Sequence, residues 1–170
     1  KKDDSYSNVP TDPSSPRLTD GKLSPTVESC YNEHWFYSPG GGAMDFFYDI
    51  GYLSSVETLT ISLLEYKDWG IARPEDVSVF LSDDGKTWYR VAMETRNNDE
   101  INKKGTRINY EYKLDKAYAA RFVRFRMEGA MMFIDEFEAI GTKKVTNKTA
   151  RLADSEFCTS IFHTNRESAE

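Results

Sequence analysis

The side chains best suited to binding are aromatic and hydrogen-bonding residues in stretches without regular patterning. Trp35, Tyr37 and Trp69 offer flat faces that can stack on the apolar side of a sugar ring. One apolar platform with a few polar groups suits a small neutral ligand. Asp99 could add a further hydrogen bond. The residues that we predict to bind a ligand are His34, Trp35, Tyr37, Trp69, Arg73, Asn97 and Asn98.

Acidic residues gather at 83–84 and at 135–138, so catalysis by paired carboxylates has to be considered. The segment 83–85, Asp-Asp-Gly, has the composition of a tight turn. Glu136 and Glu138 share one face of an expected strand, where a cation or Arg124 could neutralise them. No two carboxylates are expected to face each other across a groove. We therefore predict no catalytic residues and no enzymatic activity.

Histidine and cysteine give little support to a metal or nucleophile site. The chain has two histidines, and His163 lies far from His34 without a ligand-like spacing. Cys30 has no base in a recognisable pattern, which favours a buried or paired thiol over a nucleophile. Whether Cys30 pairs with Cys158 stays open, because sequence does not fix the distance between them.

The elements that must position these residues are short strands. Apolar and polar residues alternate from Ala43 onward, most cleanly at 107–114, which is typical of strands with one buried face. No helical period is found before residue 142. Such a series predicts an all-β, antiparallel sandwich or barrel. The expected strands are 44–50, 58–64, 76–82, 88–94, 107–114, 122–127 and 132–140, with a further short strand at 26–30.

The stretch from Trp69 to Trp88 shows the expected unit in full. Arg73-Pro74 closes a loop, because proline fixes its own φ and biases the preceding residue away from helix. A strand follows, and Asp84-Gly85 supplies the positive φ angles of a two-residue hairpin turn. We expect Trp88, which opens the returning strand, to lie in the core.

Alternating strand directions divide the connections between two ends of the sandwich. One end receives the short turns at 51–55, 83–86 and 115–119. The other end receives the long or aromatic connections at 31–42, 66–74, 95–105 and 129–131. Function on β scaffolds usually resides on long loops held by a rigid frame. The predicted ligand-binding residues all fall on this second end.

Length and charge narrow the function further. A chain of 170 residues can bury roughly 70% of its unfolded surface, which favours one domain. The formal charge of −6 argues against nucleic acid and anionic membranes as partners, and no apolar run is long enough to cross a bilayer. We expect a linker or extended arm at 1–17, the sandwich at 18–141, and a tail at 142–170 that carries a short helix near 151–162 or links to a further domain.

Six segments of the chain form recognisable motifs in order, at 18–21, 49–51, 70–74, 77–85, 121–124 and 135–141. Together they resemble the galactose-binding-like sandwiches, which include the discoidin (coagulation-factor 5/8 C-terminal) domains and the family 32 carbohydrate-binding modules. The resemblance covers about residues 18–141. It implies a jelly-roll β-sandwich that is not catalytic, is appended to secreted enzymes acting on glycans, and holds sugar in loops at one end.

The same resemblance implies a structural calcium ion near the junction of the two chain ends. In this sequence the implied carboxylate ligands are Asp20 and Glu136. Calcium takes about six to eight oxygen ligands, which this pair and backbone carbonyls of residues 21–24 could supply together.

These observations lead to two hypotheses. The first is a carbohydrate-binding module, part of a larger secreted or cell-surface glycan-processing protein, that binds a glycan weakly. The second is a protein-interaction or adhesion module on the same frame, which a large apolar patch around Trp35, Trp69 and Met131 would favour.

Overall fold

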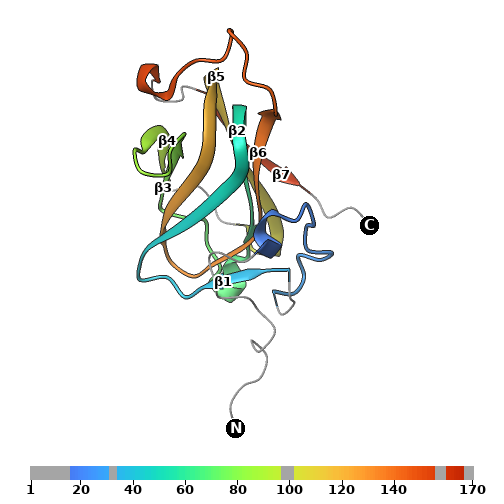
Figure 1. Cartoon of the computed structure of the whole chain (residues 1–170). Coiled ribbons are helices and arrows are strands. Elements are labelled where there is room, and N and C mark those ends of the chain that lie inside the picture. The colour runs from blue at the N-terminus through green and yellow to red at the C-terminus, as the bar shows by residue number, and fades with distance from the viewer. Residues whose placement is uncertain (1–15, 31–33, 97–101, 156–159, 167–170) are drawn as a thin grey trace.

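The computed structural model describes residues 16–30, 34–96, 102–155 and 160–166 (Figure 1). Within these residues every pair of neighbouring strands runs antiparallel. The strands are β1 (Phe36–Ser38), β2 (Gly42–Glu65), β3 (Asp76–Ser82), β4 (Tyr89–Thr95), β5 (Thr106–Gly129), β6 (Met132–Thr142) and β7 (Ser160–Arg166). The short 3₁₀ helices are η2 (Pro16–Thr19), η3 (Lys67–Trp69) and η4 (Leu152–Asp154).

The frame of the molecule is a pair of long strands, β2 and β5, each of 24 residues. They pair from Gly42 opposite Gly129 to Glu65 opposite Thr106, with register shifts near the middle. Bulges of this kind bend a strand and increase its twist. Gly51, with φ of 95°, lies at the bend of β2, where a residue with a Cβ would be strained.

Both ends of β2 lie at one end of the molecule, so the strand pair folds back on itself. The amide of Gly41, just before β2, donates to the carbonyl of Gly129, and the amide of Ala72, just after β2, donates to that of Met131. The predicted reversals at 51–55 and 115–119 are therefore real. They are bends within paired strands instead of separate loops, because Ser55 stays opposite Ala119.

Folding back creates two layers with a hydrophobic core between them. One layer contains β4, β3, the second half of β5 and the first half of β2. The other contains β1, β6, the second half of β2, the first half of β5, and β7. Phe46 of the first layer contacts Phe36 and Phe137 of the second, with ring centroids 5.2 and 4.9 Å apart. The predicted antiparallel jelly-roll sandwich is confirmed.

The connection between β3 and β4 differs from its prediction. β3 ends at Ser82 and β4 begins at Tyr89, so the loop is longer than a two-residue turn. Asp84 organises this loop, because its Oδ1 accepts the backbone N–H groups of Lys86 at 2.7 Å and Thr87 at 2.8 Å. These bonds lower the pKa of Asp84 to about 2.

Trp88 is not a core residue, which corrects the expectation for it. The longer loop lays it over the outer face of the first layer, where it is half-buried. Its ring meets that of Phe47 edge to face, with centroids 5.8 Å apart. Core space between the layers is filled by other phenylalanines instead, including Phe125 and Phe137 at 4.5 Å.

After β6 the chain crosses the bend end and returns along the second layer. The helix expected near 151–162 is a single 3₁₀ turn, Leu152–Asp154, in the described residues, and β7 follows it. The backbone N–H and C=O groups of β7 find hydrogen-bond partners in β5 and not within a helix. The two strands pair from Ser160 opposite Lys113 to Arg166 opposite Arg107. The described residues contain no helix with the length and apolar character needed to span a bilayer.

Candidate ligand-binding site at the loop end

The end of the molecule that holds both ends of β2 also carries η3 and β1, and we call it the loop end (Figure 1). Six buried residues form a small hydrophobic cluster here, against which Tyr37, Tyr66 and Met131 pack half-buried. The cluster supports the surface above it. Its buried members are Val27, Cys30, Trp35, Leu64, Ile71 and Phe133. Burial raises the pKa of the Cys30 thiol, which disfavours the reactive thiolate; Cys158 lies outside the described residues.

Among the described residues, the most accessible aromatic surface at this end is a stacked pair. The rings of Tyr66 and Trp69 are 4.5 Å apart and 6° from parallel. Trp69 remains 39% exposed. The local backbone fixes the pair, because Tyr66 bridges to Ile71 and Gly70 adopts the left-handed conformation that ends η3. The result is a preformed, partly exposed indole platform.

A fully buried carboxylate anchors the loops around this platform. Glu65, the last residue of β2, forms an ion pair with Arg73 Nε and accepts the backbone N–H of Asn102 at 2.8 Å. Lys67 N–H donates in turn to the carbonyl of Asn102 at 2.9 Å. One charged group thus ties the connection after β2 to the connection before β5. Arg73 keeps 12% of its side chain exposed at the surface of this network.

Trp35 does not bind a ligand through its face, which corrects its predicted role. It is completely buried, its Nε1 donates to the carbonyl of Thr26 at 3.3 Å, and the Arg107 guanidinium lies over its ring at 5.4 Å. The indole therefore serves as core for the segment before β1. The sequence correctly predicted that Trp35 lies at the loop end. It did not indicate whether the indole points into the core or toward solvent.

The remaining predicted residues divide into two groups. Tyr37 and His34 are half-buried at the loop end, and the Tyr37 ring lies 5.2 Å from that of Phe133. Asn97 and Asn98, like Asp99, lie outside the described residues. The structure therefore places Tyr37 and, through its stacking on Tyr66, Trp69 at the loop-end cluster, whereas Arg73 lies at the same end in its ion pair with Glu65.

Two residues of this site were missed by sequence reasoning. Tyr66 follows an apolar strand and reads as its continuation, although it is the stacking partner of Trp69. Glu65 gave a usable signal, because a carboxylate directly after the apolar pair Leu63-Leu64 at the end of a buried strand demands a partner. Arg73 is that partner.

The implied calcium ligands lie on the side of the sandwich, where the segment after η2 crosses β6. Gly21 N–H donates to Glu136 Oε1 at 3.0 Å, whereas Oε2 is buried without a hydrogen-bond partner among the described residues. Burial raises the pKa of Glu136 to about 7, and the nearby charge of Asp20 adds to the shift. A cation would satisfy the unpaired oxygen. No group of three Asp, Glu, His or Cys side chains with metal-binding geometry occurs in the described residues, so backbone carbonyls would have to complete the shell.

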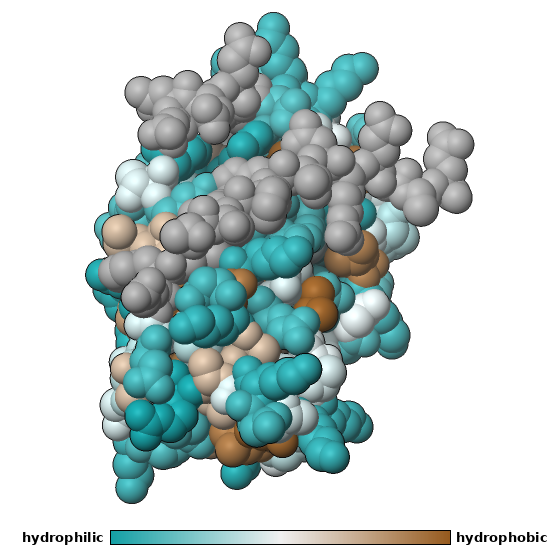
Figure 2. All heavy atoms as spheres, turned by 90° about the horizontal axis from the view of Figure 1, so that it is seen from above, coloured by the Kyte–Doolittle hydropathy of each residue, from teal (hydrophilic) through white to brown (hydrophobic). Residues whose placement is uncertain are grey.

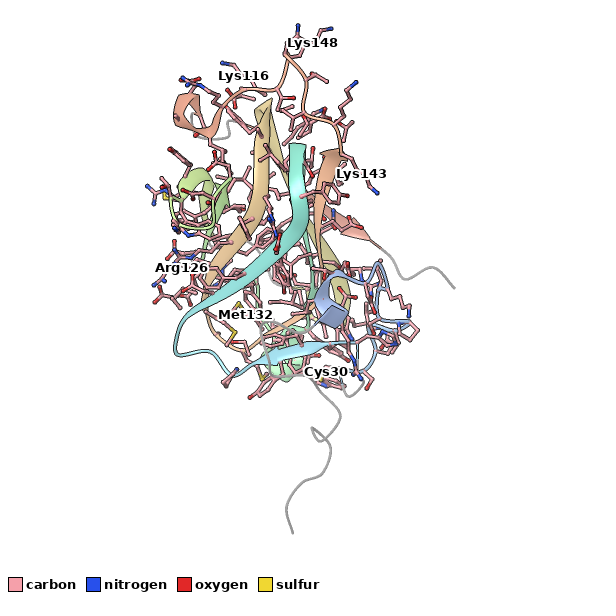
Figure 3. The ribbon with its side chains drawn as sticks, in the orientation of Figure 1. Cys30, Lys116, Arg126, Met132, Lys143 and Lys148 are labelled. Carbon is pink, nitrogen blue, oxygen red and sulfur yellow. The ribbon has the colours of Figure 1, made fainter. Side chains whose placement is uncertain are left out.

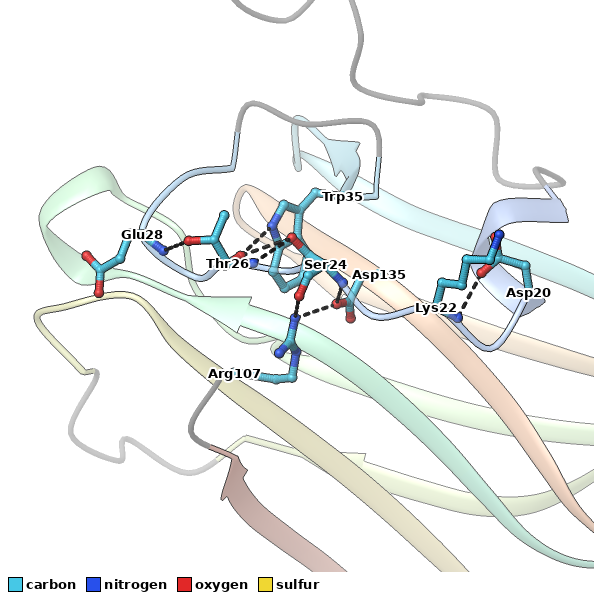
Figure 4. A network of polar contacts seen from close by, with 8 residues as sticks. All are labelled: Asp20, Lys22, Ser24, Thr26, Glu28, Trp35, Arg107 and Asp135. Atoms are coloured by element: carbon cyan, nitrogen blue, oxygen red, sulfur yellow. Dashed lines mark hydrogen bonds and ion pairs between the residues drawn. The ribbon is translucent and has the colours of Figure 1, made fainter. Parts of the chain in front are cut away.

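The neighbouring acid, Asp135, has a structural role. Its Oδ2 accepts Arg107 Nη2 and the Ser24 amide, both at 2.8 Å (Figure 4). Burial raises the pKa of Asp135 while the Arg107 charge opposes that shift. Arg107 Nη2 also donates to the Ser24 carbonyl at 2.7 Å. This buried network fastens the segment 20–26 to the second layer and thereby holds the residues opposite Glu136.

A cavity of about 460 Å³ opens beside Glu136, between the first half of β2 and β6. It lies on the side of the sandwich and not at the loop end, with Tyr48, Phe125 and Phe137 in its lining. Figure 2 shows that apolar residues on the face in view form separate small areas among hydrophilic ones.

No protein-family model and no curated protein sequence matches the chain. Solved structures do match its fold. Module CBM32-1 from a family 31 glycoside hydrolase of Clostridium perfringens has a TM-score of 0.53 at 18% identity, covering 79% of this chain and 97% of that one. CpGH89CBM32-6, produced by the same organism, has a TM-score of 0.51 at 20% identity, covering 75% and 84%.

A third similar structure is the lectin domain of lectinolysin complexed with Lewis B antigen. Its TM-score is 0.51 at 16% identity, covering 79% of this chain and 89% of that one. At these identities the likeness shows a shared fold. The galactose-binding-like fold expected from the sequence motifs is therefore confirmed.

Proposed function

We propose that this chain is a non-catalytic carbohydrate-binding module with its sugar site at the loop end. The observation that carries the proposal is the partly exposed Trp69, held flat on Tyr66 above a buried cluster. Structures of similar fold include carbohydrate-binding modules and a lectin domain in complex with a Lewis antigen, which supports the same function.

The chemistry of the site suits a neutral sugar. An indole held in one orientation presents its π face to the C–H bonds of a pyranose without losing further side-chain entropy. The Arg73 guanidinium, oriented by Glu65, supplies donors to ring hydroxyls, and Tyr37 and His34 border the same end. Because each such hydrogen bond replaces one to water, the stacking contact dominates and affinity is weak.

A structural calcium ion is part of the proposal. Glu136 Oε2 is buried and has no hydrogen-bond partner among the described residues, so a cation could neutralise it. Asp20 adds a second negative charge nearby. Calcium would neutralise both and fix the segment 20–24 against β6. The ion would act on the frame and not on the sugar, because the loop-end platform belongs to other segments.

Absence of catalysis is inferred from the carboxylates of the described residues. Glu65 forms an ion pair with Arg73, and Asp135 forms one with Arg107. Glu138 Oε2 accepts a hydrogen bond from the Thr60 hydroxyl at 3.0 Å. None of these acids faces another across the loop end, as glycoside hydrolysis would require. We further propose that the module belongs to a secreted or surface protein that processes glycans.

The alternative role, docking of another polypeptide at the loop end, has less support. It would need a broad apolar patch around Trp35, Trp69 and Met131. Trp35 is buried and Met131 half-buried, which leaves Trp69 as the main exposed apolar side chain of that set.

The proposal is tested with Trp69→Ala on the full chain. A glycan array identifies a ligand, and isothermal titration then compares the variants. We expect Trp69→Ala to weaken binding by about fivefold to 150-fold, since stacking on an aromatic contributes on the order of 1 to 3 kcal/mol.

The matched control is Trp88→Ala, which removes a half-buried tryptophan on the outer face of the first layer. It should bind the ligand as the parent chain does. Failure of the parent chain to bind any arrayed glycan, or equal losses in both variants, would refute the sugar site at the loop end.

A further inference from the structure

The end opposite the loop end carries a concentration of positive charge on an acidic protein. We call it the bend end, because the bends of β2 and β5 form it together with the crossing segment after β6 (Figure 1). From residue 139 to residue 153 the chain contains four basic residues and no acidic one, although the formal net charge is −6. A fifth, Lys116, lies at the bend of β5.

These side chains are accessible. Lys116, Lys143, Lys144 and Lys148 are exposed, and none of them takes part in an ion pair among the described residues. Figure 3 shows Lys148 projecting at the far tip of the molecule, with Lys116 and Lys143 on either side below it. Among the acids nearby, Asp154 pairs with Arg151, Asp115 accepts the Tyr118 hydroxyl and Asp84 accepts backbone N–H groups of its own loop, whereas Glu57 and Asp83 are exposed.

The lysines sit on a fixed backbone. Ala150 exchanges two backbone hydrogen bonds with the bend of β5, donating to Ala117 at 2.8 Å and accepting from Ala119 at 3.0 Å. Thr149 Oγ1 donates to Ser55 Oγ of β2 at 3.2 Å, and a turn closes from Thr149 N–H to the Thr146 carbonyl at 3.1 Å. The positive charges therefore keep a defined arrangement, which reduces the entropy lost when a ligand binds them.

An aromatic ring lies among these charges. Tyr52, at the crest of the β2 bend, is 42% exposed, and Lys143 Nζ is 5.5 Å from its ring centroid. A ring beside an ammonium group offers stacking to a sugar and charge to an acidic substituent of that sugar.

We infer that the bend end is a second binding surface, specific for an acidic polysaccharide whose carboxylate or sulfate groups meet Lys116, Lys143, Lys144 and Lys148. A polymer fits better than a single anion, because the lysines are spread over two connections. The inference does not depend on the proposed sugar site at the loop end.

A lipid surface fits this end less well. The exposed apolar side chains, Leu53, Val145 and Ile140, are each more than half covered, and the tip of the molecule is a lysine. A bilayer would meet Lys148 before any apolar group, whereas a polyanion in water meets the charges first and needs no apolar insertion.

The test measures binding of the full chain to polygalacturonate and dextran sulfate, with neutral dextran as reference. The bend-end variant carries Lys143→Gln, Lys144→Gln and Lys148→Gln. The charge-matched control carries Lys67→Gln, Lys103→Gln and Lys104→Gln, three exposed lysines near the loop end. We expect the parent and the control to bind an acidic polymer at low salt and to lose it at about 0.5 M salt, where charges are screened within a few ångströms.

We expect the bend-end variant to bind about tenfold or more weakly, as the loss of three exposed ion pairs allows. Equal losses in both variants would show a general charge effect and overturn the proposal. So would absence of binding to both acidic polymers, or equal or tighter binding to vesicles containing phosphatidylserine or to a DNA duplex. The bend-end variant should still bind the neutral glycan. Its weaker binding of the acidic polymer is then distinguished from a failure of the loop-end site.

Discussion

The loop end and the bend end both carry irregular connections of the β-sandwich, but different interactions hold these connections in place. At the loop end, long connections are held by buried side chains: an indole in the core and a carboxylate that serves two loops. At the bend end, the strands keep their ladder through the reversal, and backbone hydrogen bonds hold the crossing segment.

This difference teaches where sequence change should be tolerated. Side-chain anchors make the loop end sensitive to single substitutions, because removing one leaves a cavity or an unpaired charge. Backbone anchors make the bend end indifferent to most side chains, so its surface is free to vary in charge.

The largest effect should come from the two loop-end tryptophans. Trp35→Ala removes a fully buried indole and should lower the free energy of unfolding by about 3 to 5 kcal/mol. Trp69→Ala removes a partly exposed one and should cost only about 1 kcal/mol, as expected for a surface aromatic pair. Urea unfolding monitored by circular dichroism measures both. Similar losses in the two variants would mean that burial does not distinguish them.

The next effect concerns the buried carboxylate. Glu65→Gln should lower the free energy of unfolding by about 3 kcal/mol, because it removes the buried carboxylate charge that faces the nearly buried Arg73 guanidinium. The double variant with Arg73→Met should recover part of this loss, since no charge then remains unpaired. As a bend-end comparison, Lys148→Gln should change the free energy by less than about 0.5 kcal/mol. If Glu65→Gln lowered the free energy of unfolding as little as Lys148→Gln does, the proposed difference between the two ends would be contradicted.

Calcium provides a third test, at a position between the two ends. If Asp20 and Glu136 hold the ion, calcium at about 100 times its dissociation constant should stabilise the chain by about 2.7 kcal/mol. Glu136→Gln should abolish that gain, whereas Glu138→Gln, on the same strand and outside the proposed ligand set, should keep it. Thermal unfolding with calcium and with a chelator measures the difference. A parent chain with the same melting temperature in both would contradict the calcium site.

The sequence predicted the fold and the grouping of residues better than it predicted their orientation. Period-two alternation and turn residues fixed the strands, because both depend on local chemistry, and they placed Trp35 and Trp69 at one end. Which side of a loop faces inward depends on contacts distant in sequence. The Arg107 guanidinium covers the Trp35 ring, although the two residues are 72 positions apart in the sequence. No local sequence pattern indicates this contact.

The same reasoning explains the errors at Trp88 and in the bends. Asp84-Gly85 correctly signalled a reversal, but a two-residue turn would have buried Trp88, and the added side-chain bonds of Asp84 permit a longer loop. The continuous pairing of β2 with β5 is likewise a tertiary property, because Gly51 alone signals a break.

The smallest effect should come from the loop between β3 and β4, which lies at the bend end because its Gly85 is next to Phe122 just after the bend of β5. This effect should depend on pH. The pKa of Asp84 falls from 3.8 to about 2 because the folded chain donates two backbone N–H groups to its carboxylate. A lowered pKa stabilises the folded state above pH 3.8 and loses that contribution as the pH falls through about 2. Asp84→Asn should therefore lower the melting temperature slightly near neutral pH, and the difference from the parent should vanish near pH 2. Because Asp84 is fully exposed, the effect should remain well below that of Glu65→Gln at every pH; a larger effect would place a side-chain anchor at the bend end as well.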